Sequence, residues 1–530
     1  MKRAIVTSIV TFSLAACGDA PKPLTPVPPL TTEIPSPVDA AAVPTELSQT
    51  LKDTGDYRSS APKPGDAVAS NAPVPEVFTL KNGIKVYLIE RHDLPIVSVR
   101  LVSRHNGVEL ECPAKGGVCL ENAVPGARSF AAAMLEQGTK KYNALQLSDA
   151  FEAIGAQHGT WADWDSMGVF IKVTRDQLGK GLDLLAEVAL RPTFSTSEFD
   201  RLRVRRLASA RAEKDSLPAM ASNAIAHSVF SHGAYRNAIG GSPMQIEALK
   251  VDQLAQAYRA AVTRESVAFL VAGDVTRQAI TPMLEGAFAT VPAASPRTLP
   301  DLSGSTLSNG AGRKIVVVDK PQATQSFVAL ALEGPNATTA DRDALALMNV
   351  ILGGSFSSRV NMNLREKHAY TYGARSRFSM RHQSGVFTVG GNMVADKTGA
   401  AVAELLTEFD KIQAESVTES ELNDARESIL MALPGRMESV MELGSMAADL
   451  FIYGYKEDEL RTLPDRLSKV TIADVERVAK RHLDHAVYVV IVGDKAKVLP
   501  QLQAVKGPKG ETLPVTELDP WGEPVRENVK

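Results

Sequence analysis

The stretch SVAFLVAGDV, residues 266–275, and its counterpart AVYVVIVGDK, residues 486–495, decide the fold. Each consists of an apolar run that ends in a Gly-Asp pair. Each also comes after a segment of helical apolar spacing, VDQLAQAYRAA at 251–261 and IADVERVAKRH at 472–482. The chain therefore predicts helix, short loop and buried strand twice. A period of about 220 residues indicates a duplicated domain rather than a solenoid repeat.

The openings of the two repeats match more loosely. IKVYLIERHDLPIVSVRLV, residues 84–102, corresponds to RKIVVVDKPQATQSFVALAL, residues 313–332. An Asn-Gly pair before the first of these predicts a hairpin turn. We expect an α+β fold of two homologous α/β halves, each a mainly antiparallel sheet with packed helices. Their predicted bounds are 76–294 and 313–505, with a linker at 295–312 and a Pro/Gly-rich tail at 506–530.

The first residues have the pattern of an export signal. The basic start MKR precedes the apolar run AIVTSIVTFSLAA, which has the length of a signal peptide and is shorter than the roughly 20 residues that span a bilayer. The run ends in LAAC, residues 14–17, which resembles a bacterial lipobox and predicts a signal peptide over 1–17 and lipidation of Cys17. Gly18 after the cysteine favours the outer membrane, facing the periplasm. An ordinary secretory peptide with a chance cysteine is the alternative.

The segment after the signal peptide has a biased composition. Residues 18–75 are rich in Pro and Ala and predict a disordered tether, because such a segment buries too little apolar surface to fold. The whole chain has 44% hydrophobic residues, enough for sizeable cores, and a net charge of −3. This charge gives no electrostatic reason to expect nucleic-acid binding.

Two cysteines remain if Cys17 is lipidated. Cys112 and Cys119 lie in the short loop sequence ECPAKGGVC. An exported chain meets an oxidising compartment, which favours a disulfide between them. Zinc binding is the weaker alternative, because two cysteines without a companion pair supply half of a structural site.

Three further stretches point to a family. GARSFAAAMLEQGT at 126–139, HGAYRNAIGGSPMQIEAL at 232–249 and ILGGSFSSRVNMNLREKHAYTYGARS at 351–376 accompany the duplication and the Gly-Asp strands. Together they resemble the insulinase/pitrilysin zinc peptidases over nearly all of the chain beyond the tether. The resemblance implies two insulinase-like halves.

Active members of this family carry His-x-x-Glu-His on a helix of the first half. The two His bind zinc, the Glu activates a water, and a later Glu is the third protein ligand. The same frame puts Ser129 and Ala133 at the His positions and Ala132 at the position of the base. The third ligand falls near Ser209-Ala210, and Glu213, one turn away, is interpreted as surface charge. We therefore expect no zinc in this chain and no peptidase activity of the chain alone.

The second half keeps a pair that the resemblance marks as functional. Arg365 and Tyr372 match the Arg/Tyr pair that one subunit of two-subunit relatives supplies to the zinc site of the other. The Arg would hold a substrate carbonyl or carboxylate, and the Tyr would donate to the oxyanion of the tetrahedral intermediate. The alternative is a helix-surface Arg beside Glu366 and a half-buried strand Tyr. Ala369 and Tyr370 stand where the family has Gly and Leu.

Other residues with metal or phosphate chemistry have simpler interpretations. His482 and His485 have the spacing of two ligands but predict a solvated helix end. His227 and His232 are expected at the edge of the core or in a loop, and His368 is a candidate substrate contact. Gly353-Gly354 comes after a helix, so it predicts a helix stop rather than a phosphate-binding turn.

The sequence thus predicts a lipid-anchored, non-catalytic subunit of an insulinase/pitrilysin-type metallopeptidase. Its partner would be a zinc-bearing homologue in a heterodimer or larger assembly, with zinc in the partner and a peptide as substrate. One rival is an inactive scaffold or assembly protein that uses the fold for protein binding. Another is a peptidase with an unusual metal site.

Overall fold

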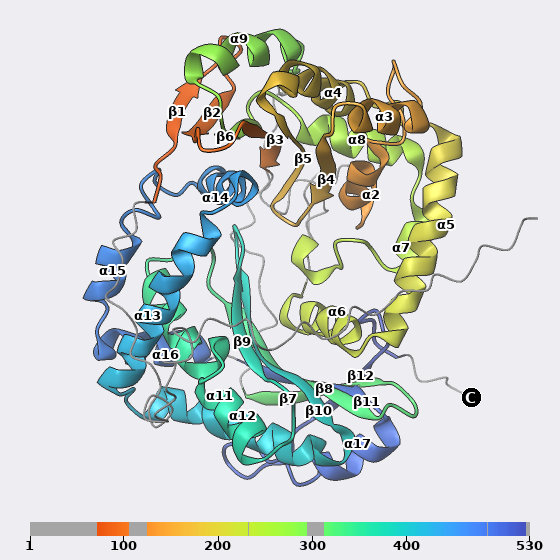
Figure 1. The fold of residues 1–530 in the computed structure, drawn as a ribbon. Coiled ribbons are helices and arrows are strands. Elements are labelled where there is room, and N and C mark those ends of the chain that lie inside the picture. Colours follow the sequence, from red (N-terminus) through yellow and green to blue (C-terminus); the bar gives the residue numbers. More distant parts are fainter. Residues whose placement is uncertain (1–71, 105–124, 232, 294–311, 485, 526–530) are drawn as a thin grey trace, which may run out of the picture. The chain divides into compact units, whose positions relative to one another are not determined.

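The computed structural model describes residues 72–104, 125–231, 233–293, 312–484 and 486–525 (Figure 1). All of them belong to one unit that begins at Ala67. The predicted signal peptide with Cys17, the pair Cys112 and Cys119, and almost all of the tether and the linker lie outside the described residues. No helix within the described ranges is long and apolar enough to cross a membrane.

The first half contains a six-stranded sheet in the order β1-β2-β6-β3-β5-β4. Strands β2 and β6 are parallel, and the other neighbours are antiparallel. The pairing of Thr79 with Lys85 closes the predicted Asn-Gly hairpin between β1 and β2. The strands are β1 Glu76–Thr79, β2 Lys85–Glu90, β3 Ile96–Arg104, β4 Gln157–Ala162, β5 Ser166–Thr174 and β6 Val267–Gly273.

The second half repeats this sheet in the order β12-β7-β11-β8-β10-β9. The two repeated apolar runs become β6 and β11, which hold the same position in their sheets and are buried at every residue. The duplicated α/β architecture is therefore confirmed. The strands are β7 Arg313–Asp319, β8 Gln325–Gly334, β9 Arg375–Met380, β10 Gly385–Val394, β11 Val487–Gly493 and β12 Val515–Leu518.

The two sheets differ in the origin of one edge strand. β1 comes from the hairpin before β2 and runs antiparallel to it, whereas β12 lies in the segment predicted as a tail and runs parallel to β7. Leu518 of β12 is buried, and the indole of Trp521 donates to the carbonyl of Ala210 at 3.1 Å. The segment therefore extends the second sheet. Four residues are too few for a sequence pattern to reveal.

The Gly-Asp pair after β6 forms a tight corner. Gly273 has φ 129°, and a Cβ there would lie 2.1 Å from the carbonyl oxygen of Ile96. Only glycine fits such an approach. The Asp274 carboxylate pairs with Arg175 at 3.0 Å and hydrogen-bonds the His92 ring at 2.7 Å. This corner fixes how β6 leaves the sheet.

Most helices cover a sheet of their own half. Those of the first half are α2 Ala127–Met134, α3 Ala144–Glu152, α4 Leu178–Leu190, α5 Thr196–Ala212, α7 Pro243–Ala248, α8 Val251–Ala261 and α9 Arg277–Ala287. Those of the second half are α10 Arg342–Asn349, α11 Arg359–Asn361, α12 Thr398–Ala414, α13 Glu419–Arg436, α15 Leu463–Lys469, α16 Ile472–Leu483 and α17 Lys495–Leu502. Together with the sheets they enclose one hydrophobic core per half.

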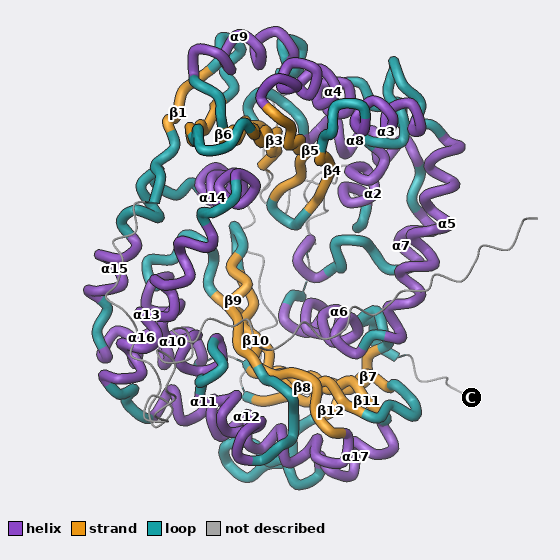
Figure 2. The backbone as a smooth tube through the Cα atoms, viewed as in Figure 1, coloured by secondary structure: helices purple, strands orange, loops and turns teal. Residues whose placement is uncertain are grey.

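Two helices instead cover the sheet of the other half (Figures 1 and 2). Helix α6, Leu217–Val229, packs on the second sheet, where Met220 and Ala224 join a cluster with Val490. Helix α14, Val440–Tyr453, packs on the first sheet through Leu443 and other residues at helical spacing. Each sheet therefore has a helix of the other half on one face, which ties the two halves together.

An ion pair anchors the start of α13. The Arg359 guanidinium donates to both oxygens of Glu421, at 2.7 and 2.9 Å. Glu421 also closes a capping box with Thr418. The hydrogen bonds from Arg359, despite partial burial, lower the pKa of Glu421 to about 2. Arg359 belongs to the segment that leads to Arg365, so this pair fixes that segment to the body of the second half.

Glu421→Gln should lower the free energy of unfolding by about 1–2 kcal/mol at pH 7, a range reduced because the carboxylate is partly exposed. The folded state depresses the pKa from 4.5, so the stabilisation is complete above pH 4.5 and is lost as pH falls towards 2. Urea unfolding at several pH values should show a constant gap from pH 7 to 5 that narrows below 4.5. Glu427→Gln, an exposed position of the same helix, is the matched control. A gap that widens on acidification would contradict this assignment.

Candidate functional site

Helix α2 contains Ser129, Ala132 and Ala133, the positions at which the resemblance places two zinc ligands and the base. Phe130, Ala132 and Met134 are buried in the core of the first half, while Ser129 and Ala133 are half-buried. Phe130 stacks on Phe199 of α5 with ring centroids 5.0 Å apart. Apolar packing thus holds the helix in place. Ser129 and Ala133, its half-buried positions, carry no imidazole.

A guanidinium group from α5 occupies the surroundings of Ser129. Arg206 donates to the Ser129 hydroxyl at 2.7 Å and to its carbonyl at 3.2 Å, and it lies 4.9 Å from the Phe130 ring. Ala210 is four residues further along, on the same face of α5. Burial lowers the pKa of Arg206, yet an arginine remains protonated at physiological pH. A fixed cation therefore joins α2 to α5.

These residues do not fit zinc. Ser129, Ala132, Ala133, Ser209 and Ala210 together offer two side-chain hydroxyls, and the Ser129 hydroxyl already accepts a hydrogen bond from a cation. Zinc needs deprotonated nitrogen, sulfur or carboxylate ligands. Glu213, one turn on, accepts from Asn223 at 3.1 Å instead. The described part of the chain contains no cluster of three or more His, Cys, Asp or Glu side chains that could hold a metal.

Each described histidine that the sequence singles out contacts another side chain. The sequence predicts a solvated helix end for His482, but its side chain is 12% exposed and bonds Asp341 at 2.8 Å. The prediction is wrong because Asp341, distant in sequence, covers that end. His227 contacts Arg236, and burial lowers its pKa to about 4. His368 stacks on Tyr370, with its ring nitrogen 3.7 Å from Glu404. His232 and His485 lie outside the described residues.

The segment before Arg365 is wound unusually. Helix α10 continues into a π-helical turn at Val350–Gly354, and a second π-helical turn lies at Met362–Lys367. A Cβ on Gly353 would lie 2.5 Å from the backbone nitrogen of Ser376, so this glycine permits close packing on β9. Gly354 is the last helical residue, in keeping with the predicted stop. Such π-helical turns are frequent at functional sites.

Arg365 lies in the second of these turns. Its guanidinium pairs with Glu366 at 3.2 Å and lies 4.7 Å from the ring of Phe356. The Phe356 side chain is 56% exposed. The pairing with Glu366 agrees with the interpretation as a helix-surface residue. The Arg365 guanidinium therefore lies over an exposed aromatic ring.

Tyr372 lies in the loop that leads into β9. Its side chain is 91% exposed, so it is not the half-buried strand residue of the alternative interpretation. Asn361 connects this loop to the preceding turn, because its amide donates to the Phe356 carbonyl at 2.7 Å and accepts from the Ala374 amide at 3.3 Å. The sequence motif thus places Arg365 and Tyr372 on one hydrogen-bonded substructure, with the phenol directed to solvent.

Ala369 follows the end of the second π-helical turn in a left-handed conformation. Its φ is 53°, and its amide donates to the Arg365 carbonyl at 3.1 Å. Glycine is favoured at such a helix end because it has no Cβ. The departure noted in the sequence, Ala for Gly, therefore places strain next to Arg365.

Ala369→Gly should relieve this strain and raise the free energy of unfolding by about 0.5–1 kcal/mol, because the left-handed conformation costs a residue with a Cβ about 1–2 kcal/mol. The entropy of the added glycine offsets part of the gain. Thermal unfolding of the two proteins measures it. Ala374→Gly, a buried position of the same segment, should instead destabilise. A less stable Ala369→Gly protein would contradict a strained left-handed conformation at Ala369.

Two family models match the chain across both candidate regions. The model described as Insulinase (Peptidase family M16) matches residues 116–242, and the model described as Peptidase M16 inactive domain matches residues 248–429. Together the matches cover more than half of the chain. The chain belongs to the M16 family. The first match contains α2 and α5, and the second contains Arg365 and Tyr372.

Relatives in the M16 family bear different names. An uncharacterized zinc protease of Rickettsia bellii is 24% identical over 426 residues, 79% of this chain and 97% of that protein. The non-peptidase homolog YmxG of Helicobacter pylori is 22% identical over 411 residues, 76% of this chain and 90% of that protein. The M16 inactive domain structure from Pseudomonas fluorescens has a TM-score of 0.70 at 22% identity, covering 79% of this chain and 98% of that one. The insulinase-like fold is thereby confirmed.

Proposed function

We propose that this M16 chain is a non-catalytic subunit that completes the active site of a zinc-bearing homologue. The observation that carries the proposal is the contrast between the two halves. The first half has lost the zinc ligands and holds Arg206 in their surroundings. The second half presents Tyr372, 91% exposed, on the same substructure as Arg365.

We assign roles to Arg365 and Tyr372 because neither side chain is buried and a substrate could reach both. Arg365 offers a rigid fork of donors for a carbonyl of the substrate peptide. Tyr372 has an exposed phenol that can donate to the oxyanion as the peptide carbonyl becomes tetrahedral. The partner supplies the zinc and its water. This chain supplies positioning and charge stabilisation, so it is inactive by itself.

Purification from native membranes tests the assembly. The chain should co-purify with an M16 protein that carries an intact His-x-x-Glu-His motif, and peptide cleavage should require both chains. The chain alone should contain no stoichiometric zinc and cleave no peptide. Co-purification with proteins that carry no such motif would instead favour the rival interpretation, an inactive scaffold that uses the fold for protein binding.

Localisation belongs to the same proposal. The lipobox predicts that Cys17 carries lipid and anchors the chain in the outer membrane, facing the periplasm. Cys17→Ser should release the protein into the soluble fraction or leave it mislocalised. Fractionation and immunodetection measure this. A Cys17→Ser protein that remains entirely with the outer membrane would overturn the lipoprotein assignment and leave the subunit assignment intact.

A further inference from the structure

The second half contains a cavity that the peptidase-related site does not use. It lies among α10, β9, α13, α14 and α15 and has a volume of about 450 Å³, within the range of small-molecule sites. Neither Arg365 nor Tyr372 lines it. Part of its wall is apolar, including Met380, Met446 and Leu450.

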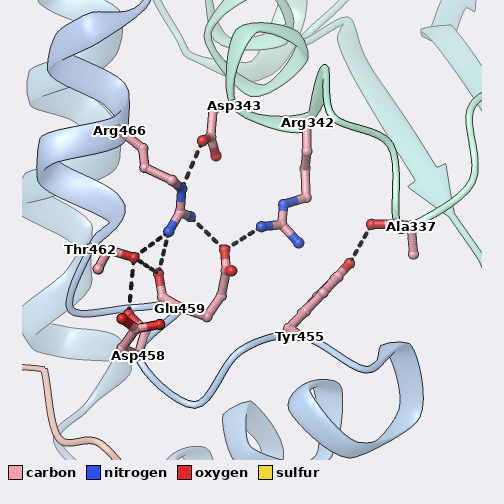
Figure 3. Close-up of polar contacts among 8 residues, drawn as sticks. All are labelled: Ala337, Arg342, Asp343, Tyr455, Asp458, Glu459, Thr462 and Arg466. Atoms are coloured by element: carbon pink, nitrogen blue, oxygen red, sulfur yellow. Dashed lines mark hydrogen bonds and ion pairs between the residues drawn. The ribbon is translucent and has the colours of Figure 1, made fainter.

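On one wall of the cavity, the charged side chains pair with one another (Figure 3). Arg466 donates to Asp343 at 2.8 Å and also pairs with Glu459, which accepts from Arg342 as well. Two guanidinium groups thus balance two carboxylates. The Arg342 guanidinium lies 4.1 Å from the ring of Tyr455. These four charges are occupied with one another and leave none for a ligand.

Among the remaining charged side chains that line the cavity, positive charges outnumber negative ones. Arg377 and Arg436 line the cavity, are solvent-exposed, and form no ion pair with another described residue. The Nε of Arg377 donates to the Ser379 hydroxyl at 3.1 Å, and its terminal nitrogens remain available. Asp449 also lines the cavity and is the one described carboxylate that faces these two guanidinium groups. The free charge is therefore positive.

We propose that this cavity binds a ligand with one carboxylate on an apolar chain. The carboxylate lies between Arg436 and Arg377, and the apolar chain lies against Met446 and Leu450. Charge-assisted hydrogen bonds from guanidinium groups favour a carboxylate. Burial of the hydrocarbon chain against the apolar wall is also favourable, because it removes apolar surface from water. A fatty acid and the C-terminus of an apolar peptide share this chemistry.

Calorimetric titration of the mature chain tests the proposal. The probes are octanoate, octanamide, octylamine, and acetylated tri-leucine with a free or an amidated C-terminus. Each carboxylate that binds should do so about tenfold more tightly than its amide, as expected for loss of a charged hydrogen-bonding partner. Binding of octanoate alone would identify a fatty acid as the source, and binding of the peptide acid alone would identify a peptide C-terminus.

Variants connect binding to the named residues. Arg436→Gln should weaken carboxylate binding about tenfold and leave the thermal midpoint unchanged, because the side chain is exposed at the end of α13. Arg461→Gln is the matched control, since Arg461 is exposed nearby and does not line the cavity. The proposal is overturned if no carboxylate probe binds, if octylamine binds better than octanoate, or if both variants behave alike.

Discussion

Tyr372→Phe should lower the turnover number of the reconstituted two-chain peptidase about a hundredfold, because it removes one oxyanion donor. The substitution keeps the ring, and the side chain is 91% exposed, so subunit association and stability should not change. Steady-state kinetics with a saturating partner and a defined peptide give the effect. Tyr370→Phe is the matched control, because it removes a hydroxyl two residues away from a ring that stacks on His368.

Arg365→Ala should act differently in the same assay. It removes a contact that the substrate makes before and during the reaction, so it should chiefly raise KM. It also frees the Phe356 ring from the guanidinium that covers it. Unchanged kinetics in both Tyr372→Phe and Arg365→Ala complexes would leave the pair without a catalytic role. The chain would then be a scaffold.

Restoring the zinc ligands should fail while Arg206 is present. The variant Ser129→His, Ala132→Glu, Ala133→His and Ala210→Glu supplies the family's ligand set and base. The Arg206 guanidinium, which bonds Ser129 in the present chain, would place a positive charge beside the histidine introduced at that position. Adding Arg206→Ala should convert a protein without zinc into one with about one equivalent. Elemental analysis after dialysis measures the metal directly.

Controls separate this effect from general loosening of the helix. Arg205→Ala, an exposed neighbour on α5, should not permit zinc binding when it replaces Arg206→Ala. A second series of variants, with Ser209→Glu in place of Ala210→Glu, tests the adjacent position for the third ligand. Zinc in the variants that retain Arg206 would contradict the assignment, as would its absence from every variant without Arg206.

Much of the fold can be predicted from the sequence. The runs that form β6 and β11 are apolar at nearly every residue, so burial on both faces is evident from composition. The Asn82-Gly83 turn is evident because few residue pairs suit a short hairpin. Local patterns of this kind need no information about distant parts of the chain.

Contacts between distant segments cannot be predicted in this way. The apolar stripe of α14, including Leu443 and Phe451, shows that one face is buried but not which sheet buries it. The partner of His482 is Asp341, a residue of another element. In the sequence, Arg206 is one of several arginines on a basic helix. Its only signal is its position three to four residues before Ser209-Ala210, where the resemblance places the missing third ligand.

The exchange of α6 and α14 has a consequence for the order of events during synthesis. The first sheet is complete in sequence at Gly273, yet α14, the helix from the second half that covers one of its faces, ends at Tyr453. At 5–20 residues per second, the intervening chain takes roughly 10–40 s to emerge from the ribosome. During that interval the apolar face of the first sheet that includes Leu270 is not yet covered by α14. We therefore expect the first half, when it is expressed without α14, to leave this apolar face exposed and not to fold stably.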